Sequence, residues 1–244
     1  MPTLTPSIQV VRSDGRMATK LDWLDSRHSF SFGSQYDPEN THFGLLFVSN
    51  DDVIKPETGF STHPHRDMEI VTWVIEGELE HKDSQGNSGL IHPGLAQRMS
   101  AGTGILHSEI NATSASDVHL VQMWVVPDTE KIRPGYEELD INSELSKGGL
   151  VALASGRGHD AAISIRQDGA VLWVGRLKPG ETIKVPDAPF AHVYVAKGDI
   201  DLEAAGPLSA GDTARVTLGG ALKATAGPEG AEVLIWEMHK QLAY

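Results

Sequence analysis

The sequence of 244 residues contains no cysteine, which excludes disulfides, thiolate metal ligands and cysteine nucleophiles. Basic residues are also scarce: 20 Lys and Arg stand against 33 Asp and Glu, which gives a formal net charge of −13. Direct binding to nucleic acid is therefore not expected, because phosphate backbones are bound by basic surfaces. A protein partner remains an alternative route by which such an acidic protein could act on DNA.

Long hydrophobic runs are missing as well. The sequence has no run of about 18 apolar residues and does not begin with a charged and then apolar leader. Its hydrophobic fraction of 40% is nevertheless enough for an ordinary buried core. Together with the absence of cysteine, these features predict a soluble cytoplasmic protein that does not enter a membrane.

What the sequence contains throughout is short β-like segments separated by turns. Residues 69–76 are rich in Val, Ile, Thr and Trp, and Gly- and Pro-rich turns follow them. The pattern breaks over residues 128–147, which we interpret as a linker with one helical turn, and then restarts. Short strands at such regular spacing are typical of sandwiches and barrels. We therefore predict an all-β protein with units at residues 1–127 and 148–244.

Two polar pairs of the same form mark the first unit, His63-Pro64-His65 and His107-Ser108-Glu109. In a strand alternate side chains share a face, so each pair places two donors side by side. Hairpins between the pairs can bring the second beside the first. We therefore predict a metal site made of His63, His65, His107 and Glu109.

The donor types narrow the metal. Neutral imidazole with a carboxylate and no thiolate suits a divalent first-row ion such as Fe(II), Mn, Ni, Co, Cu or Zn. Closed structural zinc sites usually contain Cys, which this sequence lacks. Four protein donors around an ion that prefers six leave two positions for water, oxygen or a chelating substrate. The pattern therefore favours a catalytic site over a structural one.

The same stretch resembles a known family. The segments THPHRDMEIVTWVIEGELEHKDSQGN and MSAGTGILHSEIN are similar to the paired motifs HPHRGxE and AGxGxxHxE of the pirin family, within the cupin superfamily. Further likeness lies at residues 27–33 and 121–125, so the resemblance covers most of residues 20–140. The sequence has Asp67-Met68 where the family often has Gly-Phe or a similar pair, at positions that are not ligands.

The resemblance implies a bicupin fold, with two small antiparallel jelly-roll barrels packed together. The first barrel would bind one divalent metal per chain, with Fe(II) favoured. The second would be a degenerate copy without metal, since His192 has no HxH or HxE partner. Bacterial pirin-like proteins are associated with quercetin 2,3-dioxygenase activity, which implies a flavonol-like substrate and O2. Because Glu109 is the only anionic group among the predicted ligands, we predict that it is the catalytic base. The alternative is a non-enzymatic metal protein that senses redox state or regulates transcription through a partner.

Several other residues carry expectations about the site. Phe60 and Trp73 are predicted to be apolar walls of the substrate pocket. His28, in an alternating aromatic segment, is interpreted as a core residue rather than a site residue. Asp51 and Asp52 could act as an acid–base pair, but a solvated turn is the favoured interpretation.

Three further positions are predicted to lie away from the chemistry. Residues 7–12 should form an edge strand added to one barrel. His81, in a charged run, should be exposed, and Tyr136 should pack between the domains rather than close over a pocket.

Overall fold

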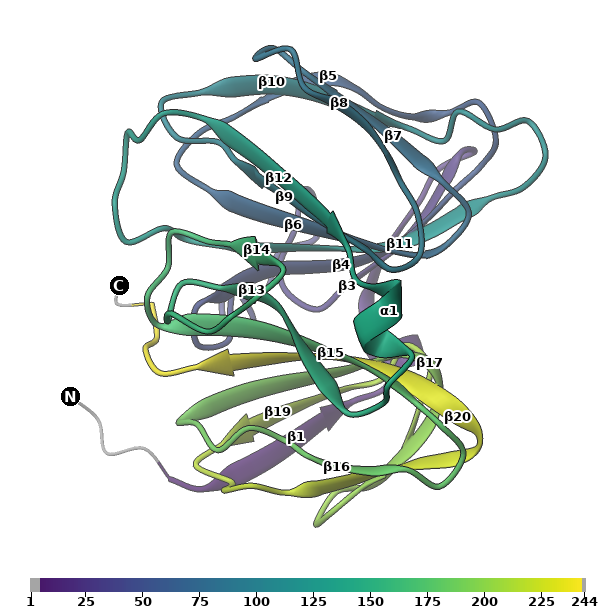
Figure 1. The fold of residues 1–244 in the computed structure, drawn as a ribbon, viewed down its shortest axis with the longest axis vertical. Helices are drawn as coiled ribbons and strands as arrows, with labels where there is room; N and C mark the ends of the chain where they lie inside the picture. The colour runs from purple at the N-terminus through teal and green to yellow at the C-terminus, as the bar shows by residue number, and fades with distance from the viewer. Residues whose placement is uncertain (1–4, 243–244) are drawn as a thin grey trace.

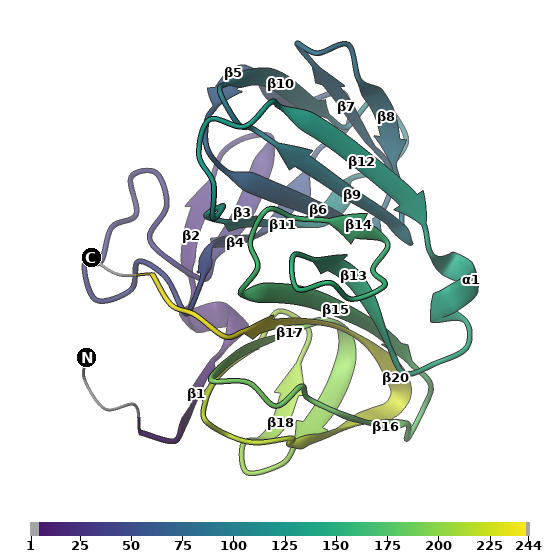
Figure 2. The same cartoon turned by 60° about the vertical axis from the view of Figure 1, so that its left-hand side comes forward.

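A computed structural model of the protein describes residues 5–242 and is almost entirely β, arranged as two stacked barrels (Figures 1 and 2). The first four residues of the predicted unit 1–127 and the last two of the unit 148–244 lie outside the described part. Within it, the prediction of an all-β fold with two barrels is confirmed. No helix of residues 5–242 is long and apolar enough to span a membrane.

The N-terminal barrel, uppermost in Figure 1, is formed by two antiparallel sheets. The larger has seven strands in the spatial order β12 (Gly135–Asp140), β9 (Leu95–Ser100), β6 (Glu69–Glu76), β11 (Val118–Val125), β4 (Leu46–Ile54), β3 (Leu24–His28) and β2 (Met17–Lys20). The smaller has four, in the order β5 (Gly59–His65), β10 (Ile105–Ile110), β7 (Leu79–Asp83) and β8 (Ser88–Ile91). Apolar side chains from both sheets share one core between them.

The C-terminal barrel is a single sheet of nine strands. Its main path is β1 (Ser7–Val11), β19 (Thr213–Thr217), β17 (Phe190–Leu202), β20 (Lys223–Met238), β15 (Ala170–Leu177), β13 (Leu150–Ser155) and β14 (Ile163–Ser164). Off this path, β16 (Thr182–Lys184) pairs with β20 and β18 (Gly206–Ser209) with β17. The predicted N-terminal edge strand is confirmed as β1, and it belongs to this second barrel. The predicted unit 1–127 therefore gives one strand to the other barrel, joined through a single 3₁₀ turn at Ser13–Gly15.

The prediction that residues 128–147 form a linker with one helical turn is partly wrong. The helical turn is present as α1 (Asn142–Leu145), but β12 lies just before it and pairs along its whole length with β9. This strand is intermediate to exposed throughout, so its sequence shows no alternation of apolar and polar residues. An edge strand that buries little hydrophobic surface cannot be recognised from periodicity.

The largest hydrophobic core lies between the barrels, where the larger N-terminal sheet packs on the C-terminal sheet. Trp73 of β6 is fully buried in it, and its Nε1 donates to Glu232 Oε1 of β20 at 2.8 Å. The prediction that Trp73 lines a substrate pocket is therefore wrong. Nearly all of β6 is buried, so neither face is marked as polar and the sequence does not say which one meets the cavity.

A buried carboxylate joins the two barrels at the same interface. Asp51 of β4 accepts hydrogen bonds from Tyr194 Oη of β17 and from His119 Nε2, both at 2.6 Å, and Arg16 Nη1 lies 3.4 Å away. Burial alone would raise the pKa of Asp51, but the His119 hydrogen bond and the Arg16 charge hold that pKa below its usual value. The predicted solvated turn at Asp51 and Asp52 is wrong, because both carboxyl groups lie in β4 and have polar partners inside the protein.

We predict that Tyr194→Phe lowers the free energy of unfolding by about 1.5–3 kcal/mol, the range for a hydrogen bond to a charged group. Denaturant titration measures this change. Tyr36→Phe is the matched control, since Tyr36 is 74% exposed. Equal effects of the two substitutions would show that the bond to Asp51 contributes nothing to the union of the barrels.

Candidate metal centre

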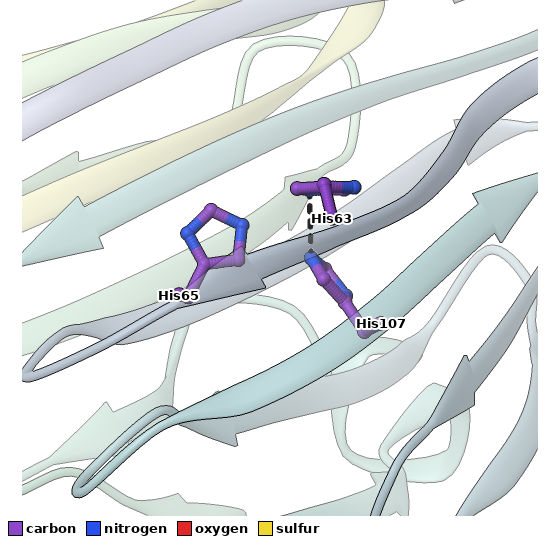
Figure 3. A group of neighbouring side chains, drawn as sticks. All are labelled: His63, His65 and His107. Carbon is purple, nitrogen blue, oxygen red and sulfur yellow. Dashed lines mark hydrogen bonds between the residues drawn. The ribbon is translucent and has the colours of Figure 1, made fainter.

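Three of the predicted ligands meet on the inner side of the smaller sheet (Figure 3). His63 of β5 stands directly opposite His107 of β10, and their Nε2 atoms are 3.1 Å apart. His65 follows two residues later on the same strand, with ring centroids 4.8 Å from His63 and 4.9 Å from His107. One nitrogen of each ring lies within 4.8 Å of the others, close enough to share one metal ion.

Two local features of the ladder set this geometry. At Gly59, where β5 begins, an added Cβ would lie 2.2 Å from the backbone oxygen of Glu109, so only glycine permits the close approach of β5 to β10. The pairing register then shifts between His107 and Glu109, which brings Glu109 opposite Phe60. Such irregularities re-aim side chains near functional sites.

The chemistry of the three imidazoles fits a metal. Nδ1 of His63 lies 2.8 Å from the Ser61 carbonyl, which places the ring hydrogen on Nδ1 and the lone pair on Nε2, the atom that faces His107. Nε2 of His65 is buried without a hydrogen-bond partner among the described residues. Burial and the neighbouring imidazoles lower the pKa of His65 to about 4 and that of His107 to about 3, so both rings are neutral at pH 7.

Glu109 is buried beside the histidines but is held by other partners. Its Oε2 accepts a hydrogen bond from Gln122 Nε2 at 2.7 Å, and its Oε1 lies 3.4 Å from Thr72 Oγ1. It groups with His107 and His81 rather than with all three histidines of the triad. The structure thus gathers three of the four predicted ligands and places the carboxylate next to one of them.

His81 is an unpredicted part of this centre. It was expected to be exposed, yet it is fully buried, because β7 pairs with β10 and puts His81 opposite Glu109 and Asp83 opposite His107. Nδ1 of His81 lies 3.5 Å from Nδ1 of His107, and its Nε2 lies 3.5 Å from Asp83. The prediction that Tyr136 packs between the two units, away from the chemistry, is wrong: it lies on β12 of the N-terminal barrel, with its ring 5.0 Å from that of His81.

This arrangement can orient His107. For Nε2 of His107 to bind a metal, the ring proton must sit on Nδ1, where Nδ1 of His81 can accept it. His81 then carries its own proton on Nε2 and points it at Asp83. The signal in the sequence was a third polar pair at alternate positions, His81-Lys82-Asp83, hidden by the flanking charges that suggested an exposed turn.

A cavity of about 340 Å³ opens beside the triad. Its apolar walls are Leu21, Trp23, Leu24, Phe32, Phe60 and Trp124. Phe60 is therefore a wall as predicted, while Trp124 takes the role expected of Trp73. His28 is buried, but it also lines the cavity, so interpreting it as a core residue alone was wrong.

The C-terminal barrel has a different interior. Its core consists of aliphatic side chains and alanines from all sides of the sheet. His192 is buried outside that core, toward the N-terminal half, with its ring 5.9 Å from that of Phe30. Among residues 5–242, both groups of three potential metal ligands belong to the N-terminal barrel.

Two antiparallel barrels, one of them carrying a cluster of histidines and a carboxylate, define a bicupin. The pirin family model matches residues 10–125, and a model described as the quercetinase C-terminal cupin domain matches residues 152–238. The chain belongs to the pirin family, and the resemblance and the bicupin fold expected from the sequence are both confirmed.

The similarity of this chain to three relatives extends over most of each protein. A Mycobacterium tuberculosis protein provisionally named quercetin 2,3-dioxygenase is 54% identical over 98% of each chain. The Escherichia coli K12 protein named quercetin 2,3-dioxygenase is 41% identical over 74% of this chain and 77% of its own. The crystal structure of the E. coli pirin YhhW in complex with nickel(II) has a TM-score of 0.87 and 34% identity, covering 97% of this chain and 100% of that one.

We predict that His81→Ala lowers the affinity for a divalent metal by about 10- to 100-fold, the usual effect of losing the group that orients a metal-binding imidazole. Titration with Ni(II), followed by calorimetry, measures the affinity. His159→Ala is the control, because His159 lies in the other half of the chain and bonds Ser155. If the folded His81→Ala protein binds the metal with unchanged affinity, His81 does not contribute to the metal centre.

Proposed function

We propose that the protein is a metal-dependent dioxygenase that opens the central ring of a flavonol such as quercetin. The observation that carries the proposal is the convergence of three imidazoles, beside a buried carboxylate, at the wall of a largely apolar cavity. The relatives named quercetin 2,3-dioxygenase support the reaction class. The nickel(II) complex of the related E. coli pirin supports a metal in this fold.

In this proposal His63, His65, His107 and Glu109 hold one divalent ion. When bound, the metal would supply Lewis-acid polarisation of the flavonol oxygens and a place for O2 to react. We favour Fe(II), and Mn, Ni, Co, Cu and Zn suit the same donors. Glu109 would reach the ion by a change of its side-chain torsions away from the present partners.

The protein's own residues position the substrate and move a proton. Glu109 takes the proton of the 3-hydroxyl group on a carboxylate oxygen as the flavonol enters. Gln122 Nε2 and Thr72 Oγ1 donate to the two oxygens of the Glu109 carboxylate. They would hold this carboxylate in position when it binds neither the metal nor the substrate proton. The apolar side chains of Phe60, Trp23 and Trp124 flank the substrate and exclude water.

We predict that the double substitution His63→Ala/His65→Ala leaves the protein without bound metal, because two of its three clustered imidazoles are lost. Mass spectrometry of the metal content and β circular dichroism check this. His92→Ala, at a turn outside the barrel interior, should keep one metal per chain. Full metal retention in the folded double variant would refute the assignment of the ligands.

We predict that Glu109→Gln lowers flavonol turnover by about 10²- to 10⁴-fold per bound metal, the usual contribution of a general base. Loss of flavonol absorbance and oxygen uptake measure the rate, and division by metal content separates loss of the base from loss of the ion. Glu229→Gln, at an exposed position of β20 in the other barrel, is the control. Wild-type turnover in metal-loaded Glu109→Gln would disprove the base. If the metal-loaded wild type consumes no oxygen with any flavonol, the dioxygenase proposal fails and a regulatory metal protein becomes the better account.

A further inference from the structure

A strip of polar side chains crosses the cavity face of the larger N-terminal sheet. Thr72 of β6 pairs directly with Gln122 of β11, Gln122 pairs with Asn50 of β4, and Asn50 pairs with His28 of β3. Directly paired residues project to the same face, about 5 Å apart. The four side chains therefore form a continuous row beneath the cavity, and it begins at the partners of Glu109.

Only the first half of the row is used by the centre already described. Thr72 and Gln122 bond Glu109, and Oε1 of Gln122 also accepts a hydrogen bond from Trp124 Nε1 at 3.0 Å. These contacts leave Gln122 only its second amide hydrogen and one lone pair of Oε1. The other half of the row is therefore better placed to recognise a substrate group away from the metal ligands.

The other half has unused capacity. Asn50 is 4% exposed, and its Oδ1 is occupied by His28 Nδ1 at 2.9 Å. Asp52, two residues along on the same face of β4, is 3% exposed, and its Oδ1 accepts a short hydrogen bond from Ser26. No described residue hydrogen-bonds Nδ2 of Asn50 or Oδ2 of Asp52. Both residues line the cavity, and neither atom is sealed in the core.

Polar atoms that open onto a cavity take their hydrogen-bond partners from it, either water or a polar group of a ligand. The atoms at Asn50 and Asp52 are one donor and one acceptor, on side chains two residues apart in β4 that line the same cavity. A hydroxyl group satisfies both at once, since it accepts through its oxygen and donates its hydrogen.

We propose that Asn50 and Asp52 form a second recognition point, which binds a phenolic hydroxyl of the aromatic substrate while another part of that substrate lies at the metal ligands. Asn50 Nδ2 donates to the hydroxyl oxygen, and Asp52 Oδ2 accepts the hydroxyl hydrogen. The inference rests on the proposed function for its class of substrate. Because most of the remaining wall is apolar, the pair selects hydroxylated rings over bare ones.

The test compares two flavonols on the metal-loaded, full-length protein. Quercetin carries several phenolic hydroxyls, whereas 3-hydroxyflavone keeps only the 3-hydroxyl and 4-oxo groups that would face the metal. Quenching of tryptophan fluorescence gives both dissociation constants, since Trp23 and Trp124 line the cavity. The variants are Asn50→Leu and Asp52→Leu, similar in size and without polar atoms. Asp201→Leu, at an exposed position of β17, is the control.

The wild type should bind quercetin about 10- to 100-fold more tightly than 3-hydroxyflavone, and each cavity variant should lower that ratio by about tenfold. Asp201→Leu should keep it. Asp52→Asn should restore part of the ratio, because its amide oxygen can still accept. If either leucine variant fails to fold, the alanine variant at the same position replaces it.

Two results would overturn the inference, and they differ. If both flavonols bind but the ratio is the same in the wild type and in folded Asn50 and Asp52 variants, the second recognition point is wrong and flavonol binding stands. If neither flavonol binds the metal-loaded wild type, the proposed substrate class fails together with its recognition point.

Discussion

The structure depends on one sheet that is buried on both faces. In β6, β11 and β4, alternate side chains pack against the C-terminal barrel, and the residues between them face the interior of the N-terminal barrel, where those of β11 and β4 line part of the cavity. Trp73 and Thr72 are neighbours in sequence, yet the first contacts Glu232 of the other barrel and the second contacts Glu109. A slip of one residue in register would exchange these roles along a whole strand. The union of the barrels therefore fixes the register that places the polar row beneath the cavity.

The adjacent carboxyl groups of Asp51 and Asp52 lie on opposite faces of this sheet and have different surroundings. Asp51 points to the interface, where His119, Arg16 and Tyr194 stabilise its charge. Asp52 points to the cavity, where burial raises its pKa to about 7 against the opposing effect of the Ser26 hydrogen bond. One carboxyl group holds the molecule together, and the other is available to the cavity.

The sequence predicted those features that follow from local pattern. Alternation in strands was enough to put His63 and His65 on one face, because side-chain direction in a strand is fixed by geometry. Placing His107 beside them also needed the assumption, met by the pairing of β10 with β5, that hairpins bring the two motifs together. Prediction from local pattern failed where the burial of a side chain depends on partners distant in the sequence. Trp73 lies in a strand without a polar face, and His81 and Asp51 are polar residues whose partners come from other strands. The proximity of Glu109 to His81 needed the pairing of β7 with β10, which no local signal in either strand specifies.

The return of β1 to the far barrel has a consequence for how the molecule assembles. Ser7–Val11 completes the edge of the sheet at Thr213–Thr217, so the start of the chain pairs with a segment that is synthesised near its end. Contacts so distant in sequence slow folding, since closing the long intervening loop costs entropy before the contact can stabilise the fold. Until the last strands emerge from the ribosome, β1 has no partner and exposes an unpaired edge. The second barrel carries none of the clustered histidines. Its completion nevertheless sets the moment at which β1 is paired and no longer available for aggregation.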